Sequence, residues 1–341
     1  MKPRIQVNGA TGLRVVANSY EGATQGRRSA NWLASSSGPN ASLTGNLPTL
    51  RNRSRAAYRN NPLISMGLRR GVSNEIGTGI VPRFLSKDKA YNEAISPLVD
   101  RWARECDPEL NLDYYGLQTQ MCRARRTSGE CFVRFRRRSI TSGLSIPFQI
   151  QVLEADFVPT ELYEVRPNGN KVKAGIEYNK RNQRVAYWMY PEHPGERNSD
   201  AYGGRLLRIP AKEVIHHFEP TRPGQSRGEP DTVQSLLKAH TFDSYDDAEL
   251  VRKQTKAPYT GFLSRDAYES TDDGSYNFDP FTGEPLPTGT DVPELNVSPG
   301  SMLTGLPGEK LTLFQGDDTG QGYVDFMREQ KLGIAAGIGI P

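Results

Sequence analysis

Four carboxylates fall close together in one stretch of the chain, at Asp243, Asp246, Asp247 and Glu249. On a helix, residues three and four apart are neighbours on one face, so most of these side chains would form a single acidic surface. Such a surface repels anions and attracts cations. Two interpretations are open: an ordinary solvated helix face, or a helix that packs beside copies of itself and turns its acids towards a shared space.

Arginines that can contact phosphate or carboxylate groups occur in two clusters: Arg51, Arg53 and Arg55, and Arg134 and Arg136. The first cluster lies on a predicted helix that ends before Pro62. The second shares one face of a predicted strand over residues 131–138, whose other face is apolar. Guanidinium groups bind nucleic acid or the acidic surface of a neighbouring subunit equally well, and both alternatives stay open.

His216 and His217, followed by Glu219, are the residues best suited to catalysis or metal binding. Adjacent residues on a strand point to opposite faces, so the two imidazoles cannot readily hold one ion. The chain contains no GxxxxGK[ST], HExxH or GxSxG pattern. We therefore expect no metal, no cofactor and no enzymatic activity, with an unfamiliar enzyme site around His216 and Glu219 as the weakest alternative.

The helix that carries the acidic residues is predicted over residues 231–257. Asp231 follows Pro230 in the position of an N-cap, and Pro258 ends the pattern. A helix of this length spans roughly 40 Å, more than a small core requires. Its apolar positions form one narrow stripe: Val233, Leu236, Leu237, His240, Ala248 and Val251. These features predict an element that spans a gap or joins subunits.

Composition places the chain among loop-rich proteins with small cores. Of its 341 residues, 36% are hydrophobic, 33 are glycine and 24 are proline. Such a chain is expected to gain stability from neighbouring subunits. Residues 1–138 carry 23 Lys and Arg against 10 Asp and Glu, a net charge of +13, whereas residues 139–341 carry 20 against 29, a net charge of −9. This asymmetry favours self-association, or separate faces for different partners.

No apolar run is long enough for a membrane span, and the N-terminus lacks the apolar stretch of a secretion signal. We expect a soluble, intracellular product that makes no membrane contact. The cysteines form no CxxC pair and are expected to be reduced, partly buried thiols: Cys106, Cys122 and Cys131.

The remaining pattern predicts an α+β protein. Residues 1–50 are rich in Gly, Ser, Asn and Thr, which is typical of a loosely packed arm. Helices are expected around 91–106, 115–126 and 323–337, and strands at 80–84, 131–138, 148–156, 175–179, 185–190 and 214–218. Residues 264–316 lose this periodicity, with short strands expected at 294–297 and 310–314. The small residues of the final GIAAGIGIP predict tight helix packing or a hinge.

Segments spread over nearly the whole chain match one known family in their order. They are LRNRSRAAYRNNP at 50–62, IGTGIVP at 76–82, SGECFVR at 128–134, LEAD at 153–156, GIEYN at 175–179, VAYWMY at 185–190, HHFEPTRPGQSRG at 216–228, LPGE at 306–309 and IAAGIGIP at 334–341. The most specific are IAAGIGIP and the loop formed by Arg222, Pro223, Gly224, Gln225, Arg227 and Gly228. Through these segments the chain resembles the portal proteins of tailed bacteriophages, in their lambda-like branch.

The resemblance implies a fold and its division into parts. These are an N-terminal arm with a basic helix (1–60), an α/β wing (61–230), a first stem helix (231–258), a small α/β clip module (259–316) and the start of a second stem helix (317–341). Family members continue beyond the segment that IAAGIGIP resembles, into a helical crown that we expect this chain to lack.

The resemblance also implies a function and partners. Such proteins form a ring of about twelve subunits at one capsid vertex, closed by cyclic symmetry. Double-stranded DNA passes through the axial channel during packaging and ejection, and the clip binds the terminase large subunit and later the head-tail connector protein. The major capsid and scaffold proteins are further partners. The expected location is the portal vertex of the virion, after assembly in the host cytoplasm.

Within such a ring, the carboxylates Asp243, Asp246, Asp247 and Glu249 are expected to line the channel, where they would repel phosphates and keep the duplex sliding. The arginines of both clusters are expected at contacts between subunits or with DNA. The rival hypothesis is a non-enzymatic nucleic-acid-binding protein that uses the basic residues 1–138 as a monomer or small oligomer.

Overall fold

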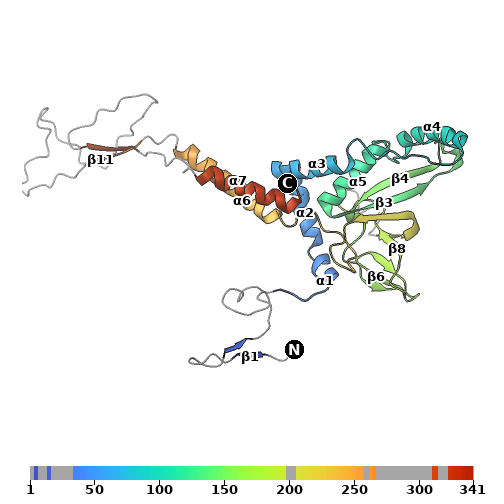
Figure 1. Cartoon of the computed structure of the whole chain (residues 1–341), viewed down its shortest axis with the longest axis horizontal. Helices are drawn as coiled ribbons and strands as arrows, with labels where there is room; N and C mark the ends of the chain where they lie inside the picture. The colour runs from blue at the N-terminus through green and yellow to red at the C-terminus, as the bar shows by residue number, and fades with distance from the viewer. Residues whose placement is uncertain are drawn as a thin grey trace, which may run out of the picture.

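The computed structural model describes residues 4–6, 14–16, 34–196, 205–256, 261–265, 309–313 and 322–340. Its helices are α1 (Pro39–Thr44), α2 (Leu47–Asn60), α3 (Pro62–Ile76), α4 (Lys89–Glu105), α5 (Tyr114–Ser128), α6 (Leu236–Lys256) and α7 (Gly322–Ile338). Its strands are β1 (Arg4–Gln6), β2 (Arg14–Val16), β3 (Glu130–Arg137), β4 (Phe148–Glu154), β5 (Glu164–Val165), β6 (Lys171–Lys173), β7 (Ile176–Tyr178), β8 (Arg184–Met189), β9 (Leu207–Pro210), β10 (Val214–Phe218), β11 (Gly261–Arg265) and β12 (Glu309–Leu313). Figure 1 shows two parts: an α/β body made by α2 to β10, and the helix pair α6–α7 that leads away from it.

A three-stranded antiparallel sheet in the order β10-β3-β4 lies at the centre of the α/β body. Helix α5 packs on one face, where Cys131 Sγ lies 3.6 Å from the Met121 carbonyl oxygen. Helix α4 extends this layer, since Trp102 Nε1 donates a hydrogen bond to the Phe148 carbonyl oxygen at 2.7 Å. The alternation predicted for residues 131–138 is confirmed, because Cys131 faces the helices while Phe132 packs on the other side of the sheet.

The second sheet has five strands in the order β5-β6-β7-β8-β9 and packs against the side of the first that carries Phe132. The rings of Phe132 and Tyr187 meet edge to face at 5.5 Å, a favourable arrangement for aromatic pairs. The core between the sheets consists of Phe132, Leu153, Val158, Ile176, Tyr178, Tyr187, Met189, Ile209 and Val214.

A second core joins the helix pair to the body. Helices α6 and α7 are antiparallel, because Ser235 just before α6 bonds to Ile334 near the end of α7, while Asp246 bonds to Tyr323 at the start of α7. Helix α3 packs against their body end, as Figure 1 shows. The buried side chains of this core are Ile64, Leu68, Ala239, Phe242, Met327, Ile334 and Ile338.

The break predicted between two N-terminal helices is confirmed. Asn61 separates α2 from α3 and caps α3, since its Oδ1 accepts a hydrogen bond from the Ile64 amide at 2.9 Å. The prediction of a loosely packed arm up to residue 50 is wrong for its last part, because α1 and α2 bury Leu43 and Leu47. Apart from β1 and β2, residues 1–33 of that arm lie outside the described residues.

One predicted helix boundary and one predicted strand differ from the structure. Helix α6 begins at Leu236, and residues 231–235 form turns, because the Asp231 carboxylate accepts from Arg125 and Arg126 instead of capping a helix. The strand predicted at 80–84 is absent, since the Ile80 amide and carbonyl both bond to the side chain of Gln118 and have no strand partner.

The segment between the helix pair contains an antiparallel strand pair, β11–β12, whose second strand agrees with the one predicted at 310–314. The strand predicted at 294–297 lies outside the described residues. None of the described helices combines the length and hydropathy that crossing a membrane requires.

Candidate functional site

The loop that follows β10, residues 220–230, is held by its own side chains. Gln225 Oε1 accepts from the Thr221 and Arg222 amides at 2.9 and 3.1 Å, and its Nε2 donates to the Arg227 carbonyl oxygen at 2.9 Å. Ser226 donates through its amide and its hydroxyl to Asn40 Oδ1 at 2.8 Å. The family-like loop is therefore a rigid connection that also fixes α1 against the body.

Arg227 extends from this loop into the centre of the body and is fully buried. Its Nε donates to Glu130 Oε1 at 2.7 Å, and its terminal nitrogens donate to the carbonyl oxygens of Ala155, Val158 and Ala174 at 2.8 to 3.2 Å. A buried guanidinium is tolerated only when its donors are satisfied, and this one has an acceptor for each nitrogen. Arg227 thus joins the loop to β3, to the connection between β4 and β5 and to the turn between β6 and β7.

Glu130 is the shared anion of this site. Besides Arg227, its carboxylate accepts from Arg51 of α2, from the Gly228 amide at 2.9 Å and from His216 Nε2 at 2.8 Å. Burial would raise the pKa of Glu130, but Arg227, Arg51 and His216 hold the pKa well below its usual range. We name Glu130, Arg51, Arg227 and His216 the buried ionic cluster.

His216 takes part in this cluster as a neutral donor. Burial lowers the pKa of His216 to about 4, against the opposing effect of Glu130, so the ring carries no charge at pH 7. Its neighbour His217 pairs with Cys131 in the sheet register and lies on the α5 side. The two histidines therefore face opposite ways, as the strand pattern predicts.

Two glycines allow the loop to approach the start of β3. A Cβ on Gly228 would collide with the Gly129 carbonyl oxygen, and a Cβ on Gly129 would collide with the backbone of Glu229. Gly129 also has a φ of 87°, in the left-handed region that favours glycine. These contacts explain why small residues are required at both positions of the SGE and QSRG segments.

A second set of ion pairs fixes the turn that leads into α6. Arg125 and Arg126 of α5 both contact Glu75 and Asp231, and Arg125 also contacts Glu219 at 3.0 Å. Glu219 therefore acts as an ion-pair partner of Arg125, and the structure does not bring it together with His216 as an enzyme site would require. The network joins α3 and α5 to the base of the helix pair.

The four carboxylates of α6 do not form a single exposed surface. Asp243 accepts from Asn61 Nδ2 at 2.8 Å, Asp246 accepts from the Tyr323 hydroxyl at 3.5 Å, and Glu249 pairs with Arg252. These three are half-buried, whereas Asp247 is exposed. The acidic middle of α6 is therefore partly engaged within the chain.

The apolar stripe predicted on α6 lies largely in solvent. Leu237 is 78% exposed and Val251 59% exposed, and His240 and Ala248 are exposed as well. The helix packs on α7 through other residues, Ala239 and Phe242. We name Leu237, His240, Ala248 and Val251 the outer stripe; it has no covering element within the described part of the chain.

The glycines near the end of α7 bring the two long helices close together. Cβ atoms on Gly333 and Gly337 would collide with the side chains of Lys238 and Ser235, respectively. Ser235 Oγ uses the short distance to donate to the Ile334 carbonyl oxygen at 2.8 Å. Of the alternatives predicted for GIAAGIGIP, tight helix packing is confirmed for these two positions.

The predicted arginine contacts divide into inner and outer residues. Arg51 is buried in the ionic cluster, so the prediction of a subunit or DNA contact is wrong for this residue. Arg55 is half-buried and pairs with Glu154 and Asp156. Arg53 is exposed, and Arg134 and Arg136 are half-exposed without an ion pair to any described residue.

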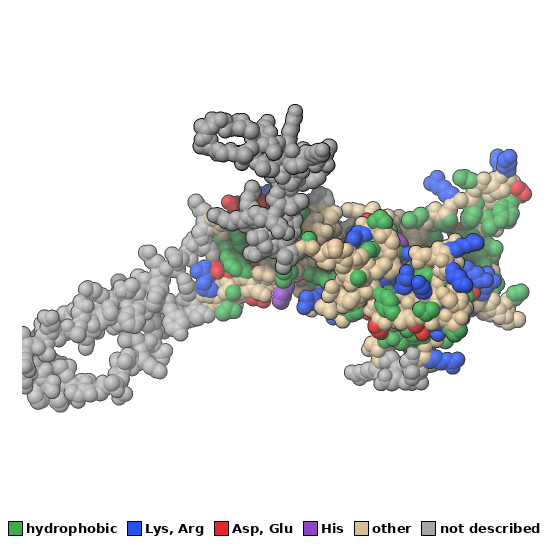
Figure 2. Space-filling model, turned by 90° about the horizontal axis from the view of Figure 1, so that it is seen from below, with side chains coloured by type: hydrophobic (Ala, Val, Ile, Leu, Met, Phe, Trp, Pro, Cys, Tyr) green, Lys and Arg blue, Asp and Glu red, His purple; other side chains and the backbone are tan. Residues whose placement is uncertain are grey.

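Basic side chains also predominate over part of the surface of the body. In the face drawn in Figure 2, Lys and Arg side chains outnumber acidic ones over the end away from the helix pair.

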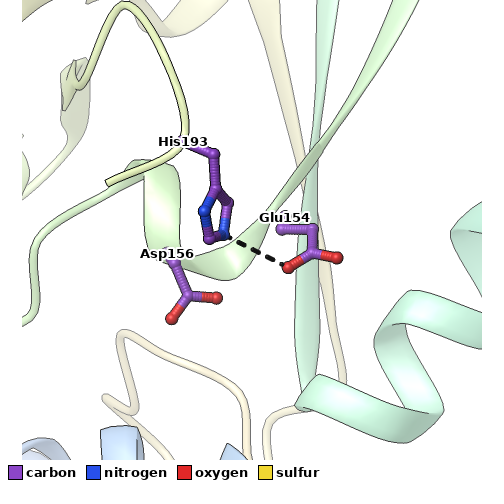
Figure 3. Close-up of side chains that lie close together, drawn as sticks. All are labelled: Glu154, Asp156 and His193. Carbon is purple, nitrogen blue, oxygen red and sulfur yellow. Dashed lines mark ion pairs between the residues drawn. The ribbon is translucent and has the colours of Figure 1, made fainter. Parts of the chain in front are cut away.

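One group of side chains has the composition of a metal site. Glu154, Asp156 and His193 place one possible ligand atom each within 4.8 Å of one another, as Figure 3 shows. However, the Gly195 amide donates to His193 Nδ1 at 3.0 Å, which leaves the proton of the neutral ring on Nε2, the atom that faces Glu154. Arg55 already contacts both carboxylates. These contacts favour an ion-pair network over a metal centre.

Sequence reasoning missed the centre of the buried ionic cluster. Glu130 precedes the apolar Cys131, Phe132 and Val133 at the start of a core strand, and an acid in that position requires buried cations. That signal was available. The partners Arg51 and Arg227 are 79 and 97 residues away along the chain, so only the fold identifies them.

Comparison with known proteins gives one family. Residues 25–341 match the family model described as phage portal protein, lambda family. A probable portal protein of Halomonas phage phiHAP-1 is 36% identical over 120 residues, which are 35% of this chain and 23% of that relative. The matched stretch therefore covers less than a quarter of the relative's length.

Solved structures show the same fold at low sequence identity. The chain resembles a chain in the neck of an empty gene transfer agent particle computed with C6 symmetry, with a TM-score of 0.51 and 12% identity over 87% of this chain and 69% of that one. A chain in the neck of the native particle computed with C12 symmetry gives the same TM-score and identity over 87% and 68%.

Proposed function

The chain belongs to the lambda family of phage portal proteins, and on that premise we propose that it forms a closed ring at one capsid vertex, through which double-stranded DNA is packaged and ejected. The family match over residues 25–341 is the observation that carries this proposal. A ring needs surfaces that a single chain leaves uncovered, and the outer stripe of α6 is such a surface. The C12 symmetry of a similar neck structure supports about twelve subunits.

Each part of the molecule then has an assigned role. The α/β body is the wing, which contacts the major capsid and scaffold proteins, and the helix pair α6–α7 is the stem. The residues between these helices, including β11 and β12, form the clip that binds the terminase large subunit and later the head-tail connector protein. The close α6–α7 packing through Gly333 and Gly337 supports the assignment of a stiff stem.

The channel surface is assigned to the acidic middle of α6. Asp243, Asp246 and Glu249 are half-buried beside neighbouring side chains, yet their negative potential extends over about 8 Å at physiological salt. Repeated around a ring, this potential keeps phosphates from binding tightly to the wall, so the duplex can slide. Exposed Arg53 and half-exposed Arg134 and Arg136 remain the candidates for DNA or subunit contacts.

The test is the assembly state of the full chain. Light scattering is expected to give the mass of about twelve protomers, and electron microscopy a ring with an axial channel. A stable monomer whose affinity for DNA falls steeply with salt would contradict the ring and support the rival nucleic-acid-binding function instead.

A further inference from the structure

An open apolar groove of about 680 Å³ runs along the side of α7 that faces α3. Its lining includes the buried or half-buried Leu63, Tyr323 and Ile338. It also includes Met66, Val324 and Leu332, which are 55%, 72% and 50% exposed. No residue of α6 lines it. We name it the α3–α7 groove. Large apolar side chains left open over this length mark an interaction surface.

The groove and the outer stripe are two different apolar surfaces of one chain. They overlap along the stem, because Ser235 lies beside Ile334 and Asp246 beside Tyr323, so the part of α6 from Leu237 to Asp246 lies at the height of the groove. Two distinct surfaces that fit each other make a heterologous contact, the kind that closes a ring of identical subunits. A two-fold dimer would instead need one surface that matches itself.

Charge supports the same pairing. The charged residues that line the groove are all cationic: Arg70, Arg328 and Lys331. Arg70 and Arg328 form no ion pair with the described residues, and Lys331 lies over the Phe242 ring. The outer stripe is flanked by Asp247, the exposed carboxylate of the acidic middle of α6. Opposite charges at the edges of two apolar surfaces favour their association and its orientation.

We propose that the outer stripe of α6 in one subunit docks in the α3–α7 groove of the next subunit, with Asp247 towards Arg328 of its rim. This inference rests on the proposed ring and names its stem contact. It assigns Asp247 to the subunit interface and leaves Asp243, Asp246 and Glu249 for the channel.

Cyclic symmetry makes the contact testable by position. Rotation about the ring axis keeps every residue at the height that it has in its own stem. Because Ser235 lies beside Ile334 and Asp246 beside Tyr323, Leu237 should lie near Leu332, and Ser244, on the same face of α6, near Val324 of the next subunit. All four residues are exposed, so cysteine substitutions there should not disturb folding. The native thiols give little background, because burial raises the pKa of Cys106 and Cys122 to about 11 and that of Cys131 to about 12.

The experiment is bismaleimide cross-linking of the full chain, assembled at neutral pH. The matched pairs Leu237→Cys with Leu332→Cys and Ser244→Cys with Val324→Cys are expected to give a ladder of covalent oligomers. The crossed pair Val251→Cys with Leu332→Cys, whose positions lie about 21 Å apart along the stem, and each single variant are expected to stay monomeric on a denaturing gel.

Each other outcome decides against the proposal. A ring of wild-type mass in which the matched pairs stay monomeric would overturn the docking and leave the portal function intact. Cross-linked dimers from Leu237→Cys alone would show a two-fold contact. Absence of any ring in the wild-type full chain would overturn the proposed function together with this contact.

Discussion

The α/β body and the helix pair differ in how far the chain itself pairs their polar groups and buries their apolar groups. In the body, Glu130 and Arg227 are fully buried, and every nitrogen of Arg227 has an acceptor within the chain. In the helix pair, Leu237 and Val251 are mostly exposed. The body therefore has a complete internal network, whereas the helix pair leaves apolar surface that only another molecule can cover. Stability should respond to mutation in the body, and assembly to mutation in the helix pair.

Removal of the central anion should have the largest effect on stability. Glu130→Gln leaves the guanidinium groups of Arg51 and Arg227 buried without a counter-charge, which costs about 3–5 kcal/mol of unfolding free energy. Urea unfolding followed by tryptophan fluorescence measures this loss. Glu196→Gln is the matched control, because Glu196 is exposed and forms no ion pair with the described residues. Equal midpoints for the two variants would show that the body does not depend on its buried ionic cluster.

The neutral His216 should make the body sensitive to mild acid. Its pKa is about 4 in the folded chain and about 6.5 when unfolded, so between these values the unfolded state binds the additional proton. Stability is therefore complete above pH 6.5 and falls as the pH drops towards 4, by up to roughly 3 kcal/mol. Urea midpoints measured from pH 7 to pH 5 test the slope, in a range above the ordinary titration of Glu130.

His216→Gln is the variant that isolates this effect, because glutamine keeps an N–H donor but does not titrate. Its unfolding midpoint should change less between pH 7 and pH 5 than that of the wild type, and the remaining change belongs to groups such as His217, whose pKa burial also lowers. A variant that loses stability as steeply as the wild type would assign the acid sensitivity to other groups.

Glycine-to-alanine substitutions at the α6–α7 contact should change the unfolding free energy by an intermediate amount. The sign should depend on the side chain that the new methyl group meets. Gly337→Ala places a methyl group against Ser235, whose hydroxyl is held by Ile334, so we expect a loss of about 1–2 kcal/mol. Gly333→Ala meets only the flexible end of Lys238 and should gain up to about 1 kcal/mol from better helix propensity. Thermal midpoints of the two variants on opposite sides of the wild type would confirm the close packing, and equal shifts would contradict it.

Much of the fold was predictable because its signals are local. The alternation after Cys131, the break at Asn61 and the long helix ending at Lys256 follow from side-chain period, capping and proline placement. The start of that helix was not predictable in the same way. Asp231 is a suitable N-cap by type, but Arg125 and Arg126 bind its carboxylate, and those residues come from more than a hundred positions earlier.

The roles of the candidate site residues were less predictable, because each role depends on which face of its helix or strand the residue occupies. An apolar stripe on a helix usually faces a core, whereas Leu237 and Val251 face solvent and Phe242 makes the core contact instead. Likewise, Arg51, Arg53 and Arg55 are alternate residues of α2, yet only Arg53 is exposed. Sequence period identifies faces but does not say which face meets which partner.

Substitution of Asp247 should have the smallest effect on the stability of the single chain, and it tests directly whether the helix pair serves assembly. It is exposed on α6, so Asp247→Asn should change the unfolding free energy by less than about 0.5 kcal/mol. If Asp247 lies near Arg328 of the next subunit, the same change should weaken each contact by up to about 1 kcal/mol and make the ring dissociate at lower salt. Light scattering across a salt series measures this.

Asp325→Asn is the matched control for that series, since Asp325 is an exposed acid of α7 that does not line the groove. The two variants change the net charge equally, so any general effect of charge on solubility or on ring repulsion is common to both. A ring weakened by Asp247→Asn alone ties assembly to the outer stripe of α6. Identical salt profiles for the two variants would remove Asp247 from the interface and return it to the channel with its three neighbours.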